Sequence, residues 1–210
     1  MTAETSWLVS RKTNRTTSVR LFCFPYAGGG ASIFHSWHKN LSDTVEVCPV
    51  QLPGRGLRIE EPPLTDINKL VRAVAEAIAS QFDKPFAFFG HSMGALIAFE
   101  LARYVRREYG LQPVRLFVSG RCSPQTARGR FNSNMSDAAF ARMLRRNNGI
   151  PAEALEDPEL MELMLPVIRA DFGLCEAYVY VSEPPFSFPI TACGGLYDYA
   201  APRECIEGWR

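Results

Sequence analysis

The sequence predicts an α/β protein, with a mostly parallel sheet, flanking helices and one all-helical insertion. Short apolar runs alternate with helix-length segments along most of the chain. Several of these runs are continuously apolar, which is typical of strands that are buried on both faces. The stretch 121–185 breaks the alternation, because it holds helical patterns without a convincing strand.

Five core strands and three helices account for the alternating part of the chain. The expected strands are Val19–Phe24, Val45–Gln51, Pro85–Phe89, Val114–Ser119 and Phe188–Cys193, with a further edge strand at Trp7–Val9. The helical patterns between them cover Ala31–Leu41, Ile67–Phe82 and Met93–Tyr109. Strands that alternate with helices favour a parallel sheet covered by helices on both faces.

The insertion is expected to hold two or three helices. Ser136–Arg146 begins with an N-cap residue, and Asp-Pro-Glu at 157–159 has the cap, proline and acid that start a helix. We expect Pro166 to end or kink that helix, with another apolar segment running to about Val181. Residues 1–120 and 186–210 would then form the core, and 121–185 a helical lid over the carboxyl edge of the sheet. The alternative is that these are ordinary flanking helices.

Composition and charge exclude several classes of protein. The 210 residues are 47% hydrophobic and 21% charged, which fits a folded domain and not a disordered chain. Lys and Arg total 23 against 22 Asp and Glu, and this balance argues against a broad nucleic-acid-binding surface. No apolar run is long enough to span a membrane, and the N-terminus lacks a secretory signal pattern. A cytoplasmic protein is therefore expected.

The six cysteines agree with that expectation. They are scattered, without a CxxC pair or a Cys/His cluster, so they predict neither a disulfide framework nor a metal site. Cys23, Cys48 and Cys193 lie in apolar runs, where cysteine packs as a small hydrophobe.

The motif GHSMG at 90–94 is the strongest chemical signal. It follows the apolar run PFAFF and precedes the helical pattern ALIAFELARYVRR, which is the setting of a nucleophile elbow. Ser92 Oγ would project at the top of the sheet, beside a helix N-terminus that can stabilise negative charge. The alternative is a tight turn with no catalytic role.

Two glycine-rich turns follow the first and the last core strand. FPYAGGG at 24–30 lacks the P-loop and dinucleotide spacings, but it lies where a hydrolase of this kind takes its second oxyanion donor. The backbone N–H groups of Ala27 and Met93 are the expected donors. Asp198, in the turn after PITAC, fits the Ser–Asp–His order of the α/β-hydrolases. A flexible turn and a surface aspartate are the alternatives.

From about Trp7 to Arg210, the chain resembles the type II thioesterases of polyketide and nonribosomal peptide synthesis. FPYAGGGAS, VQLPGRGLRIEEPP, FGHSMGALIAFELAR, LPVIRADF and PITACGGLYD occur in that family's order. The medium-chain thioesterase of fatty-acid synthesis is similar. The resemblance implies an α/β-hydrolase fold with Ser92 as nucleophile, Asp198 as triad acid, the amides of Ala27 and Met93 as oxyanion hole, and 121–185 as the lid over an acyl pocket.

The helix expected around LMELMLPVI is apolar nearly all the way round, so it should bury more than one face. One face would pack on the sheet layer. The other would line the acyl chamber with adaptable side chains, and the expected pocket residues are Met161, Met164, Leu165 and Ile168.

The histidine of the triad is where the chain departs from the family. The family carries it in a loop beyond the last strand, but no histidine follows Asp198. Of the other histidines, His91 should point away from its neighbour Ser92, and His35 and His38 should lie on a helix that runs away from the site. We therefore expect a fragment without the final strand and histidine loop, with at most trace activity. A naturally short, non-catalytic pseudo-hydrolase is the alternative.

The resemblance implies hydrolysis of an acyl thioester carried on the phosphopantetheine arm of an acyl or peptidyl carrier domain. The chain would bind no cofactor or metal, nucleic acid or membrane of its own, and is expected to be a monomer. Arg142, Arg145 and Arg146 either steer an acidic carrier domain or form the solvated face of a helix. A carboxylesterase or lipase that acts on oxoesters is the other alternative.

Overall fold

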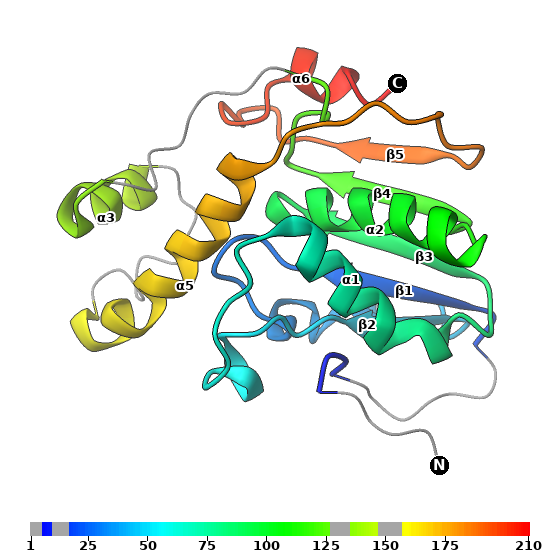
Figure 1. Cartoon of the computed structure of the whole chain (residues 1–210), viewed down its shortest axis with the longest axis horizontal. Coiled ribbons are helices and arrows are strands. Elements are labelled where there is room, and N and C mark those ends of the chain that lie inside the picture. The colour runs from blue at the N-terminus through cyan, green and yellow to red at the C-terminus, as the bar shows by residue number, and fades with distance from the viewer. Residues whose placement is uncertain (1–5, 10–16, 127–134, 147–156) are drawn as a thin grey trace.

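The computed structural model describes residues 6–9, 17–126, 135–146 and 157–210. Its centre is a five-stranded sheet with the order β2-β1-β3-β4-β5, and every neighbouring pair of strands is parallel (Figure 1). The strands are β1 Val19–Phe24, β2 Val45–Pro49, β3 Phe86–His91, β4 Arg115–Ser119 and β5 Ile190–Cys193. All five expected strands are present, with ends shifted by at most two residues. The expected edge strand at Trp7–Val9 is reduced to one antiparallel bridge between Leu8 and Val50.

Two helices cover one face of the sheet. They are α1, Ile67–Ile78, and α2, Met93–Tyr109. The Asp66 side chain caps α1 by accepting the N–H groups of Asn68 and Lys69. A left-handed Gly110 ends α2, as glycine commonly does at this position. The buried faces of both helices join the apolar side chains of β1, β3 and β4 in the main core.

The opposite face is covered differently from the expectation. The segment 31–41 is not one α-helix but two 3-10 turns, η1 Ala31–Phe34 and η2 Trp37–Lys39. A 3-10 geometry places side chains three residues apart on one side. Phe34 and Trp37 therefore meet edge to face, with their centroids 5.0 Å apart, and both pack on Phe89 of the sheet.

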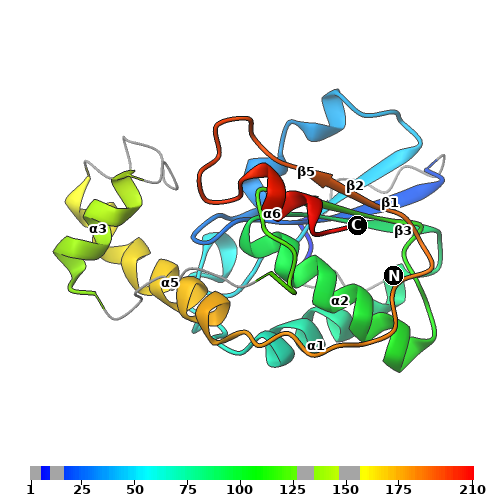
Figure 2. The same ribbon diagram turned by 90° about the horizontal axis from the view of Figure 1, so that it is seen from above.

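The connection between β4 and β5 contains α3, Asp137–Arg146, and α5, Pro158–Ala177. Asp157 caps α5 by accepting the N–H groups of Glu159 and Leu160, as its sequence predicts. Pro166 does not end this helix, which runs on to Ala177. Helix α3 and the first half of α5 stand apart from the sheet layers, at the carboxyl ends of the strands (Figures 1 and 2).

The remaining elements are short. They are η3 Gly56–Arg58, η4 Ala79–Gln81 and α6 Arg203–Glu207. No helix in the described part of the chain is long and apolar enough to cross a bilayer.

Candidate active site

Ser92 sits at a strained turn between β3 and α2. Its backbone has φ 53° and ψ −113°, and a positive φ is uncommon for a residue with a side chain. Such a conformation costs on the order of 1–3 kcal/mol and persists where surrounding structure enforces it. Here the Ser92 N–H donates to the carbonyl oxygen of Ser119, 2.8 Å away at the end of β4. This is the geometry of a nucleophile elbow.

The two glycines of GHSMG allow the chain to turn this sharply. A Cβ on Gly90 would lie 2.0 Å from the carbonyl oxygen of Gly94. A Cβ on Gly94 would lie 2.1 Å from the carbonyl oxygen of Phe24, at the end of β1. Any side chain here would push α2 away from β3 or from β1. The glycines therefore bring the N-terminus of α2 against the turn that follows β1.

That turn carries the expected oxyanion donor. The N–H of Gly29 donates to the carbonyl oxygen of Tyr26 at 2.9 Å, and Gly28 between them has φ +79°. A glycine with positive φ at the third position is typical of a type II turn. Within the described residues, the N–H groups of Ala27 and Met93 make no hydrogen bond. Both amides are thus available to a developing negative charge.

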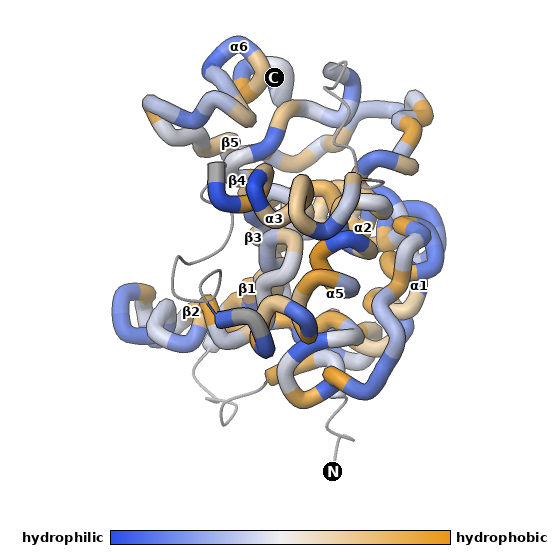
Figure 3. The backbone as a smooth tube through the Cα atoms, turned by 90° about the vertical axis from the view of Figure 1, so that its left-hand side faces the viewer, coloured by the Kyte–Doolittle hydropathy of each residue, from blue (hydrophilic) through white to orange (hydrophobic). Residues whose placement is uncertain are grey.

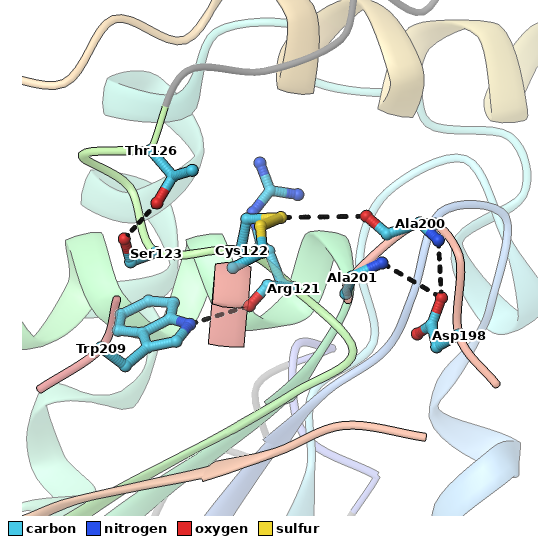
Figure 4. Close-up of a disulfide and its surroundings, with 9 residues drawn as sticks. Arg121, Cys122, Ser123, Thr126, Asp198, Ala200, Ala201 and Trp209 are labelled. Carbon is cyan, nitrogen blue, oxygen red and sulfur yellow. Dashed lines mark hydrogen bonds between the residues drawn. A yellow bond between two sulfur atoms is a disulfide. The ribbon is translucent and has the colours of Figure 1, made fainter. Parts of the chain in front are cut away.

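Asp198 lies in the turn after β5. Its Oδ1 accepts the N–H groups of Ala200 at 2.9 Å and Ala201 at 3.1 Å, which fixes the carboxylate in place (Figure 4). Because β1, β3 and β5 are parallel, their following turns lie at the same edge of the sheet. The topology therefore brings Ala27, Ser92 and Asp198 to one edge, as the sequence predicts.

None of the three histidines is paired with Ser92 in the described contacts. His91 Nδ1 lies 3.0 Å from Ser119 Oγ, and a Cβ on Gly120 would lie 2.6 Å from the His91 ring. Burial lowers the pKa of His91, against the opposing influence of the Asp198 charge. His35 and His38 line a pocket of about 420 Å³ beside β2, with Asp43 and Glu46, and Ser92 is not part of its lining.

A disulfide lies close to the Asp198 turn, and the spacing of the cysteines did not predict it. Cys122, after β4, is bonded to Cys205 of α6, with their Cα atoms 4.7 Å apart (Figure 4). Trp209 supports the same junction, because its Nε1 donates to the carbonyl oxygen of Arg121 at 2.8 Å. Cys23 and Cys48 are buried as expected. Cys193 is exposed, which corrects its expected burial, because it ends the outermost strand.

The expected pocket residues of α5 share one apolar cluster. Met161 and Ile168 are buried in it, and Met164 and Leu165 pack against it with Phe140 and Leu144 of α3. Apolar residues continue along α5 (Figure 3), but Leu163 is 61% exposed, so the helix does not bury every face. Whether these residues line an acyl chamber stays a prediction.

Two buried charged residues of the site were not predicted. Arg55 follows β2 and Asp171 belongs to α5, and they form a two-fold hydrogen-bonded pair. Their sequence signals, LPGRG and RADF, are among the motifs of the family resemblance, but neither spacing nor composition assigned these side chains a role.

Comparison with known proteins decides the family. The Thioesterase domain model matches residues 19–204. The chain belongs to the thioesterase-domain family. This thioesterase is 46% identical over 205 residues to the gramicidin S biosynthesis protein GrsT of Aneurinibacillus migulanus, covering 97% of this chain and 80% of that protein. It is 38% identical to the thioesterase PikA5 of Streptomyces venezuelae, covering 92% and 69%.

Solved structures agree with this assignment. The RedJ thioesterase of the prodiginine pathway of Streptomyces coelicolor superposes with a TM-score of 0.88 at 41% identity, covering 92% of this chain and 77% of that one. The type II thioesterase BorB of the borrelidin cluster gives a TM-score of 0.87 at 34% identity, covering 97% and 83%. The expected α/β-hydrolase fold and thioester-hydrolysing activity are thereby confirmed.

Proposed function

We propose that this thioesterase uses Ser92 to remove acyl groups from the phosphopantetheine arm of carrier domains in polyketide or nonribosomal peptide synthesis. The observation that carries the proposal is the enforced positive φ of Ser92 at the tip of a strand–turn–helix elbow. Relatives named for the gramicidin S and prodiginine pathways support the substrate class. The acyl-thioester is the substrate and the carrier domain is the partner, which a monomer of this chain would engage.

The proposed reaction has two steps. Ser92 Oγ attacks the thioester carbonyl carbon, and the oxyanion is held by the N–H groups of Ala27 and Met93. The intermediate then collapses to an acyl-serine: the carbon–sulfur bond breaks, and the pantetheine sulfur leaves as the thiol with the proton that Ser92 Oγ gave up. Water hydrolyses the acyl-serine in the second step. In a triad, the role of Asp198 is to orient a histidine and stabilise its charged form.

Direct detection of the acyl-enzyme tests the first step. The protein is incubated with an acyl-pantetheine thioester, and thiol release and intact mass are followed together. We expect one acyl group to accumulate slowly on Ser92, because no described histidine is paired with it, and none on the Ser92→Ala variant. An acyl group on another residue, or thiol release unchanged by Ser92→Ala, would contradict the assignment.

A matched pair of substrates tests the substrate class. The same acyl chain is offered as the carrier-bound thioester and as a simple oxoester. We expect the carrier-bound thioester to react faster. Equal or faster reaction of the oxoester would favour a carboxylesterase instead.

A further inference from the structure

A buried ion pair ties helix α5 to the loop after β2. Arg55 Nη1 lies 2.5 Å from Asp171 Oδ2, and Nη2 lies 2.9 Å from Oδ1. The two side chains are 8% and 3% exposed, so the pair is removed from solvent. A pair of this kind gains little net stability over apolar residues, because both charges must be desolvated. The pair is therefore weak evidence for a purely stabilising role.

Asp171 also holds the segment 26–31, which we call the oxyanion turn because it carries Ala27. Its Oδ2 accepts the N–H of Gly28 at 2.7 Å, across 143 residues of sequence. Gly28 directly follows Ala27, the proposed donor. Hydrogen bonds that an N–H donates to a charged acceptor are shorter and stronger than those between neutral groups. The bond fixes the peptide plane that follows Ala27, and so restricts the direction in which the Ala27 N–H points.

Packing adds a second link between α5 and the same turn. Ile168 is fully buried, and its Cγ1 lies 2.7 Å from where a Cβ on Gly28 would be. The far end of the turn is tied to the loop after β2, because the Ala31 N–H donates to Gln51 Oε1 at 3.1 Å. Gln51 Nε2 in turn donates to the carbonyl oxygen of Arg55 at 2.8 Å. The turn is thus held from both of its ends.

We infer that Asp171 is a positioning residue that fixes the conformation of the oxyanion turn. The geometry of the oxyanion hole therefore depends on how α5 packs against that turn. Arg55 holds the Asp171 carboxylate in the orientation that reaches Gly28. This inference rests on the proposed role of Ser92 and the Ala27 amide. The competing explanation is that the pair only joins α5 to the core.

The test compares two ligands that differ only in whether they place a charged oxygen in the oxyanion hole. An acyl-pantetheine analogue with a difluoromethylene group between the carbonyl carbon and the sulfur is an activated ketone, which accepts Ser92 Oγ at its carbonyl carbon and places a charged oxygen in the hole. The matching thioether, with a methylene in place of the carbonyl, binds without a covalent bond. The ratio of the two affinities reports the oxyanion hole and not the acyl pocket.

The Asp171→Asn variant should lose at least about 10-fold in affinity for the ketone, since one oxyanion donor contributes about 10²–10³ in rate. Its affinity for the thioether should stay within about two-fold of the wild type, because the inference assigns Asp171 no contact with the acyl chain. The matched control is Glu46→Gln, which removes a carboxylate from the buried Arg20–Glu46 pair of β1 and β2. The control should keep both affinities.

Asp171→Asn leaves the buried Arg55 without its charged partner, which destabilises the fold. A second variant therefore separates the loss of folding from the loss of the oxyanion hole. Arg55→Met combined with Asp171→Leu removes both charges and keeps the volume apolar. It should stay folded, with a lower melting temperature because the Gly28 N–H loses its acceptor, and still lose affinity for the ketone. Retained ketone affinity in either folded variant, or an equal loss for both ligands, would overturn the inference.

Amide hydrogen exchange of the wild type provides a test without substitution. We expect the Gly28 amide to be protected and to exchange together with the amides of α5 near Asp171. Free exchange at Gly28 would overturn the inference. Failure of the proposed function would look different, because the ketone would then bind Ser92→Ala as tightly as the wild type.

Discussion

Gly94 lets α2 pack closely against the end of β1, because it has only a hydrogen atom where other residues have a Cβ. Its Cα faces the carbonyl oxygens of Phe24 and Pro25, and a Cβ would lie 2.1 and 2.7 Å from them. Both contacts are backbone, so no side chain can move aside to relieve them. The approach of α2 to the end of β1, and hence of Met93 to the oxyanion turn, requires glycine at this position.

Gly94→Ala should lower the rate of Ser92 acylation by about 100-fold, since a displacement of about 1 Å costs that much in an oriented reaction. The matched control is Gly110→Ala, where a Cβ meets nothing within 4 Å. The control changes a left-handed cap and should cost about 1–2 kcal/mol of stability while keeping the acylation rate. Thiol release and urea unfolding measure the two effects. Equal acylation rates in both variants would disprove the steric argument.

His91 should make stability depend on pH in the mildly acidic range. Burial lowers its pKa below the ordinary value of 6.5, although the Asp198 charge opposes this. The unfolded chain therefore binds a proton at a higher pH than the folded protein does, and the free energy of unfolding should fall as the pH drops below about 6.5.

His91→Gln removes this titration and should flatten that part of the pH profile. Urea unfolding at pH 7.5, 6.5 and 5.5 compares the two proteins. If the free energy of unfolding falls equally with pH in the wild type and the variant, then groups other than His91 control stability in the acidic range.

At the scale of elements, the cluster between α3 and α5 distinguishes two methionines. Met161 is 8% exposed and packs with Phe140 and Leu144, whereas Met164 lies only half-buried at the border of the cluster. A larger side chain at Met161 must displace its neighbours, but one at Met164 has room to turn outward.

Met161→Phe should therefore cost about 1–3 kcal/mol of stability by overpacking, and Met164→Phe less. If α5 lines the acyl chamber, Met164→Phe should change the preference for acyl length. Thermal unfolding and competition between acyl-pantetheines of different length give both answers. A larger loss of stability for Met164→Phe, with unchanged preference, would make that position part of the core.

At the scale of the whole molecule, the Cys122–Cys205 disulfide joins two residues with a sequence separation of 83, and the loop that it closes contains α3, α5 and β5. A bond across such a loop restricts the unfolded chain and is expected to stabilise the protein by about 2–4 kcal/mol. It also anchors α6 beside the turn that carries Asp198.

The double variant Cys122→Ser with Cys205→Ser should lose that stability under oxidising conditions. Adding dithiothreitol to the wild type should lower its melting temperature to that of the variant. Cys193→Ser, at an exposed free cysteine, is the control and should leave both values unchanged. A melting temperature that is insensitive to the reductant would argue against the bond.

Local sequence determined the sheet and the elbow of this protein. Continuous apolar runs specify strands buried on both faces, and GHSMG between a strand and a helix specifies the turn at Ser92 through contacts only a few residues apart. The prediction of an α-helix over 31–41 was wrong, because the packing of Phe34 and Trp37 on Phe89 favours two 3-10 turns there.

Tertiary structure alone decided which distant residues meet. The strand order places the turns after β1 and β2 next to each other, and α5 returns across both. Asp171 thereby reaches Arg55 and Gly28 over 116 and 143 residues, and Cys122 reaches Cys205 over 83. Such pairings leave no periodic trace in the chain, because each depends on the positions of whole elements. Local propensity therefore specifies the nucleophile, and the packing of elements specifies the residues that hold its surroundings in place.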